Sequence, residues 1–111
     1  MSDWPTALRV NAFARAVEAA GGSAMVLARG DRDSGVVLLL AIDRDGTARL
    51  LERERDLDGT ARIVHRKPDL VAERDLTPYW QERRARDPDL WVVEAIVARP
   101  EPLAAETLWA D

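Results

Sequence analysis

A run of apolar residues in the first half of the chain limits the folds that this sequence can adopt. Gly35 to Ile42 reads GVVLLLAI, the longest unbroken apolar stretch in the sequence. A helix that spans a bilayer needs about 20 apolar residues, so this run is too short for one. Branched side chains fill the run and Asp/Gly clusters flank it, which is typical of a strand buried on both faces. Such a strand belongs in the middle of a sheet, with a covering layer on each face or a partner chain against one face.

The size and composition fit one domain with a normal hydrophobic core. The chain has 111 residues, of which 47% are hydrophobic. We expect a globular core over about 5–98 and a tail over 99–111 that either forms a short helix or stays loose. The absence of cysteine excludes disulfides, a thiolate nucleophile and a cysteine-ligated zinc site. The first residues lack the pattern of a signal peptide, so we expect a cytoplasmic protein with no membrane association.

The charge pattern argues against nucleic acid as a partner. The net charge is −4, and the positive residues alternate with Asp and Glu along most of the chain. Binding to nucleic acid needs a concentrated basic face. The nearest approach to one is Arg83, Arg84 and Arg86, which form a candidate anion-binding group. The sequence favours the simpler interpretation, a solvated surface rich in Arg, because no phosphate-binding loop accompanies them.

Hydrophobic spacing and turn residues predict two helices and five strands. Val10, Phe13 and Val17 form an apolar stripe on a helix over 5–20. A second helix starts with Thr77 as N-cap and Pro78 at its first position, and ends at 86. Strands are expected over 23–29, 36–42, 47–55, 61–67 and 90–97. Short connections between the first four predict a meander. The predicted fold class is α+β, with a five-stranded, mostly antiparallel sheet (meander plus a C-terminal strand) and two helices packed on one face.

Two motifs resemble those of a known bacterial family. They are Gly30-Asp31-x-Asp33-x-Gly35 before the apolar run and Asp87-Pro88-Asp89-Leu90-Trp91-Val92-Val93-Glu94 after the second helix. With the Gly-Gly end of the first helix, this pattern looks like the family catalogued as domain of unknown function 1491. The similarity covers roughly 5–97. It implies a small single-domain bacterial protein, and it implies no catalytic residues, cofactor or partner.

Clustered carboxylates raise the question of a metal site. Asp31 and Asp33 precede the apolar strand, and Asp87 and Asp89 precede the fifth strand. If both loops lie at one sheet edge, these four side chains and Glu94 could bind the divalent cations used in phosphodiester hydrolysis. The alternative, which the sequence favours, is that each Asp caps a turn or pairs with a nearby Arg. The Asp pairs at 43/45 and 56/58 precede glycines and indicate hairpin turns, not calcium loops.

Glu94 is the one charge on an otherwise apolar strand. A carboxylate in that position is exposed, paired with an Arg, or buried with a raised pKa and usable as an acid or base. The first two interpretations are favoured, because the other face of this strand is apolar enough to be the core side.

These observations predict a non-enzymatic binding or regulatory module that acts as a homodimer. Several strands are apolar on both faces, whereas two helices cover only about one face of a sheet. Trp80, Trp91 and Trp109 are the candidate interface residues, since aromatic residues are enriched at interfaces. The alternative function is a metal-dependent hydrolase or nuclease that uses the clustered carboxylates. No cofactor is expected, because no nucleotide-binding motif is present.

Overall fold

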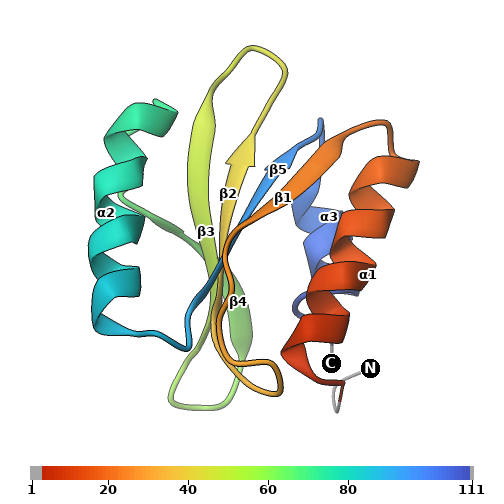
Figure 1. The fold of residues 1–111 in the computed structure, drawn as a ribbon, viewed down its shortest axis with the longest axis vertical. Coiled ribbons are helices and arrows are strands. Elements are labelled where there is room, and N and C mark those ends of the chain that lie inside the picture. Colours follow the sequence, from red (N-terminus) through yellow and green to blue (C-terminus); the bar gives the residue numbers. More distant parts are fainter. Residues whose placement is uncertain (1–3, 111) are drawn as a thin grey trace.

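A computed structural model describes residues 4–110, which fold around one five-stranded sheet (Figure 1). Its helices are α1 (Thr6–Ala19), α2 (Glu73–Arg86) and α3 (Pro100–Glu106). Its strands are β1 (Ser23–Ala28), β2 (Val37–Ile42), β3 (Ala48–Arg55), β4 (Ala61–Arg66) and β5 (Trp91–Ile96). The α+β class and the mostly antiparallel sheet are confirmed. No helix within residues 4–110 is long and apolar enough to cross a membrane.

The apolar run forms the central strand of the sheet. The strand order is β1-β5-β2-β3-β4, and β2 pairs antiparallel with β3 and parallel with β5. Every residue of β2 is buried, from Val37 at 4% exposure to Ile42 at 8%, whereas Val36 just before it is 44% exposed. The prediction of a strand covered on both faces is therefore confirmed.

The position of β5 corrects the predicted meander. Only β2, β3 and β4 follow one another as neighbours, and β5 inserts between β1 and β2. β1 therefore pairs with β5, with Ala24 opposite Ala95, and not with β2. The physical reason lies in β5 itself. Most of its residues are fully buried, so an interior place in the sheet covers more apolar surface than an edge would.

The helices are also arranged differently from the prediction. α1 and the terminal helix α3 pack on one face of the sheet, and α2 lies on the opposite face (Figure 1). We expected α1 and α2 on one face. The reason for the difference is that β2 is apolar on both parities, and Leu76 of α2 is fully buried in the cluster that holds Leu38 and Leu40. The second face is thus covered within the chain itself.

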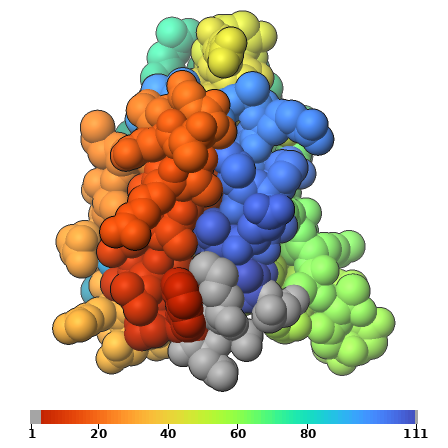
Figure 2. All heavy atoms as spheres, turned by 90° about the vertical axis from the view of Figure 1, so that its right-hand side faces the viewer, coloured from red at the N-terminus to blue at the C-terminus, as the bar shows by residue number. Residues whose placement is uncertain are grey.

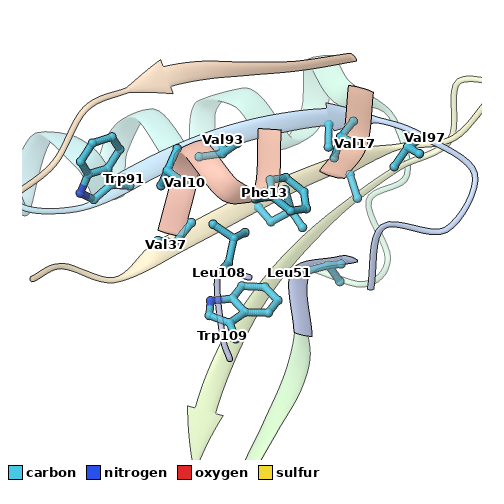
Figure 3. Close-up of a cluster of buried hydrophobic side chains, with 14 residues drawn as sticks. Val10, Phe13, Val17, Val37, Leu51, Trp91, Val93, Val97, Leu108 and Trp109 are labelled. Atoms are coloured by element: carbon cyan, nitrogen blue, oxygen red, sulfur yellow. The ribbon is translucent and has the colours of Figure 1, made fainter. Parts of the chain in front are cut away.

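Each face has its own hydrophobic core. The larger core joins α1, the sheet and the C-terminal residues around Phe13, Val93, Trp91 and Trp109 (Figure 3). The tail beyond 99 thus forms a helix, and Leu108 and Trp109 after it are buried. On the other face, α2 begins at Glu73 and not at Pro78, because Leu76 in this first turn is needed to fill the second core.

Candidate functional site

The two loops that carry the family-like motifs lie side by side, which meets the condition set for a shared site, and they contact each other through their main chains. The backbone N–H of Asp31 donates to the carbonyl of Asp89 at 3.1 Å. The indole N–H of Trp91 donates to the carbonyl of Asp31 at 2.7 Å. The same loop also caps α1, since the carbonyl of Asp33 accepts from the N–H of Thr6 at 3.2 Å. This junction ties the start of α1 to the central strands.

The carboxylates of these loops do not converge into a metal site. Asp31 accepts hydrogen bonds from the hydroxyl and the N–H of Ser34, at 2.8 and 3.1 Å. These bonds lower the pKa of Asp31. Asp87 accepts from the backbone N–H of Asp89 at 3.1 Å, while the side chains of Asp33 and Asp89 are exposed. Across residues 4–110, no group of three or more His, Asp or Glu side chains could hold a metal ion. The turn-capping alternative describes Asp31 and Asp87 correctly.

Glu94 lies apart from these loops, on the sheet face that α2 covers. Its register neighbours are Met25 of β1 and Leu40 of β2. The carboxyl is half-buried, and partial desolvation raises its pKa, helped by the charge of Glu73 and a hydrogen bond with that residue. The direction of this shift agrees with the raised-pKa alternative, whereas a role for Glu94 as an acid or base stays a prediction. The neighbour that causes part of the shift is an acid of the first turn of α2.

The three arginines in the last turn of α2 do not point to one anion site. Arg83 forms a bidentate pair with Glu52 of β3, at 2.5 and 2.7 Å. Arg66 of β4 donates to the same carboxylate at 3.0 Å. Arg84 donates to the carbonyl of Arg29 at 2.8 Å, and Arg86 is exposed. Arg83 is therefore occupied by a carboxylate of the chain itself.

Two of the three tryptophans proposed for an interface are core residues. Trp91 is 1% exposed and Trp109 is 7% exposed, and both belong to the larger core. Trp80 is half-buried and packs against the second core from α2. Their aromatic surface is therefore used mainly inside the fold.

One part of the exposed apolar surface lies at the β1 edge of the sheet. β1 is a terminal strand of the sheet, and its sequence SAMVLA contains no charged residue. Met25 is 60% exposed and Val26 is 37% exposed, and Ile96 on the neighbouring strand is 39% exposed. Figure 2 shows β1 and the loop after it along the flank of α1, on the side away from α3. This uncharged edge is the candidate interaction site.

The opposite edge of the sheet differs in chemistry. β4 reads ARIVHR, and its arginines at 62 and 66 are both ion-paired, with Asp56 and with Glu52. Charged side chains on an edge strand discourage pairing with another chain. Sequence reasoning missed the contrast because it took β1 as the first strand of a meander and did not fix the order of the strands in the sheet.

Comparison with known proteins gives a consistent assignment. The family described as "Protein of unknown function (DUF1491)" matches residues 5–104. The crystal structure of a DUF1491 family protein from Caulobacter crescentus CB15 is 34% identical and has a TM-score of 0.80; the match covers 89% of this chain and 92% of that one. An NMR structure of a DUF1491 family protein from the same organism is 34% identical with a TM-score of 0.75, covering 88% of this chain and 89% of that one.

A further solved structure shares the fold. The solution structure of protein Atu0922 from A. tumefaciens is 26% identical and has a TM-score of 0.74, covering 91% of this chain and 92% of that one. No curated protein matches the sequence. The names of the matching structures assign no activity, so the function has to be argued from the geometry of this chain.

Proposed function

This chain belongs to the DUF1491 family of proteins of unknown function, and we propose that it is a non-enzymatic, cytoplasmic binding module that acts as a homodimer. The observation that carries the proposal is the uncharged, exposed edge strand β1. In an antiparallel pair, every second residue of a strand points its N–H and C=O away from its neighbour. An edge strand therefore offers a row of hydrogen-bonding groups to another strand.

A second copy of the chain is the occupant that this edge fits. When two copies pair through β1 about a two-fold axis, β1 of one copy lies beside β1 of the other. Any charged side chain near the axis would then face the same charge on the second copy and be repelled. β1 has none, whereas the same arrangement at β4 would bring its arginines together. The regular part of β1 ends at a register shift after Val26, so we place the axis near Met25. Met25, Val26 and Ile96 then lose exposed apolar surface.

Support for a binding role also comes from how the carboxylates are used. Asp31 and Asp87 accept hydrogen bonds within their own turns, and Glu52 is bound by two arginines. These groups hold loops and α2 in place, which is a structural task. The apolar surface exposed at β1 lies along a strand, which suits recognition of another chain by strand addition.

Light scattering coupled to size-exclusion chromatography tests the homodimer. At micromolar concentration the wild type should have twice the 12.4 kDa mass of the chain. Met25→Lys places a charge on the exposed edge and should give a monomer. Val71→Lys is the matched control, because Val71 is 56% exposed and lies outside β1, and it should remain a dimer. A monomeric wild type would reject the homodimer, and a dimeric Met25→Lys would reject β1 as its interface.

A further inference from the structure

Glu94 belongs to a row of side chains that crosses the α2 face of the sheet and ends at the β1 edge. Met25 of β1 is in register with Glu94 on one side, and Leu40 of β2 is in register with it on the other. Beyond Leu40, the row continues to Leu50 of β3 and Arg66 of β4. Only β1 therefore lies between the carboxyl of Glu94 and the open edge of the sheet.

The carboxyl of Glu94 contacts a second carboxyl, that of Glu73 in the first turn of α2. Within the described part of the chain, Glu73 is the charged group that acts on the pKa of Glu94. The residues in register with Glu94 on β1 and β2 are apolar, and Arg66 of the same row and Arg83 of α2 both donate to Glu52. Two carboxylates in contact repel each other, so a proton held between them is favoured.

Assembly through β1 changes the surroundings of this carboxyl pair. With the two-fold axis near Met25, residues opposite each other point to the same face, so the two Met25 side chains lie beside each other on the α2 face. Each is 60% exposed in the single chain and is the register neighbour of Glu94. The row then runs from one Glu94 across two methionines to the other Glu94, and the methionines exclude water from both carboxyls.

This loss of water matters more than repulsion between the two copies. Strands lie about 4.8 Å apart, so three spacings separate the two Glu94 backbones by about 14 Å. That distance exceeds the Debye length, which is about 8 Å at physiological ionic strength, and much of the repulsion is screened. Burial acts on each carboxyl directly and favours its neutral form. A group that is easier to protonate after assembly draws in protons, so assembly strengthens as the pH falls.

We propose that assembly through β1 is coupled to proton uptake by the Glu73–Glu94 carboxyl pair, so that the homodimer tightens as the pH falls. The inference rests on the homodimer proposed above and adds a regulatory role to its interface. At high pH both carboxyls are ionised, and covering them with methionine leaves buried charge without a positive partner. A proton from solvent removes part of that charge.

The dissociation constant of the dimer, measured by sedimentation equilibrium at about pH 6 and about pH 8, tests the coupling. For the wild type it should be about tenfold or more smaller at the lower pH, the order expected when each copy takes up one proton. Glu94→Gln has no charge to lose at this position, so its two constants should be nearly equal. At the higher pH its constant should be smaller than that of the wild type. Equal wild-type constants at the two pH values would overturn the coupling.

Glu106→Gln is the matched control for net charge. Glu106 is exposed at the end of α3, on the opposite face of the sheet, and its replacement removes the same charge as Glu94→Gln. The control is needed because the net charge approaches zero near the pI of 5.0, which favours association of any kind. Glu106→Gln should keep the pH dependence of the wild type. An equal loss of pH dependence in both variants would assign the effect to net charge and contradict the proposal.

Glu73→Gln guards against a loss of folding in Glu94→Gln. Glu73 is exposed in the first turn of α2, so the variant should melt close to the wild type and show a smaller pH dependence of the dissociation constant. An unchanged pH dependence in a folded Glu73→Gln would count against a shared proton. A wild type that is monomeric at both pH values would reject the homodimer and this coupling with it, whereas a dimer of constant affinity would reject the coupling alone.

Discussion

At the scale of single residues, the family-like motifs are explained by packing. A Cβ on Gly30 would overlap the carbonyl oxygen of Asp89 and lie 2.6 Å from Cδ1 of Trp91. Gly35 approaches the same carbonyl, and its φ of +151° lies in a region that side chains rarely adopt. The two glycines let the loop close over Trp91, whose indole bonds to Asp31. The motif that suggested a metal site therefore serves to join two strands and a helix.

Gly30→Ala tests this explanation. The clash is with backbone, which cannot move aside as a flexible side chain would, so we expect a loss of about 3 kcal/mol in the free energy of unfolding. Gly46→Ala is the control, because a Cβ at that position would meet nothing within 4 Å and only the φ of +89° is unfavourable. That cost is about 1 kcal/mol. Urea denaturation measures both, and a smaller loss for Gly30→Ala than for Gly46→Ala would contradict the packing role.

Residue patterns alone predicted the turns but not the long-range partners. Asp before Gly correctly indicated the connections at 43–46 and 56–59, because such turns depend on local hydrogen bonds. The partner of Arg83 was missed, since Glu52 lies 31 positions away in the sequence. The available signal was that Glu52 shares a strand parity with Ala48 and Leu50, both buried. An acid on a buried strand face requires a positive partner.

At the scale of elements, α2 is held to the sheet by this ion pair as well as by apolar packing. Burial by itself raises the pKa of Glu52, but the hydrogen bonds and charges of Arg83 and Arg66 outweigh it and lower the pKa overall. The folded-state pKa is thus below that of the unfolded chain, which is about 4.3. The pair therefore stabilises the fold above that pH, and this contribution is lost as the pH falls through the folded-state pKa.

Removal of one partner of the Glu52–Arg83 ion pair should lower the free energy of unfolding more than removal of both partners. Arg83→Met leaves the buried carboxylate of Glu52 with Arg66 alone, and we expect it to lower the free energy of unfolding by about 3 kcal/mol at pH 7. Adding Glu52→Leu should restore much of that loss, because an apolar pair needs no charge compensation. The deficit of Arg83→Met should also shrink at acidic pH, as the pH falls through the pKa of Glu52 and its carboxylate is neutralised. Denaturant titrations at both pH values measure this, and additive losses in the double variant would contradict the coupling.

At the scale of the whole molecule, the central strand and the class of fold were predictable, whereas the arrangement around them was not. The run Val37–Ile42 is apolar at every position, and that local pattern implies burial on both faces. Nothing local specifies that β5 pairs parallel with β2, since Leu39 and Val93 are far apart in the chain. The covering of the second face by α2 was missed for a related reason. Its residues are mostly polar, and only Leu76, Tyr79 and Trp80 face the second core.

The side chains of successive β2 residues are buried in alternate cores, and this arrangement gives the last prediction. Leu39 is buried in the larger core with Phe13, and Leu38 is buried in the second core with Leu76. Replacing either with Ala should lower the free energy of unfolding by about 2–5 kcal/mol, the range for a fully buried leucine. Because both cores share the same strand, each variant should still unfold in one transition.

Comparison of the urea midpoints from two spectroscopic probes decides whether the two cores unfold together. Far-UV circular dichroism follows the helices and strands. In a Trp80→Phe background, which removes the tryptophan of α2 that packs on the second core, tryptophan fluorescence reports on Trp91 and Trp109 in the larger core. In Leu38→Ala the cavity lies on the opposite face from these tryptophans, yet both signals should shift to the same lower urea midpoint. If α2 and the second core melted first, the dichroism would fall while the fluorescence stayed native. That result would show that the two cores unfold independently. A common midpoint is expected because both faces of β2 are buried, one in each core, so that loss of either core exposes the central strand.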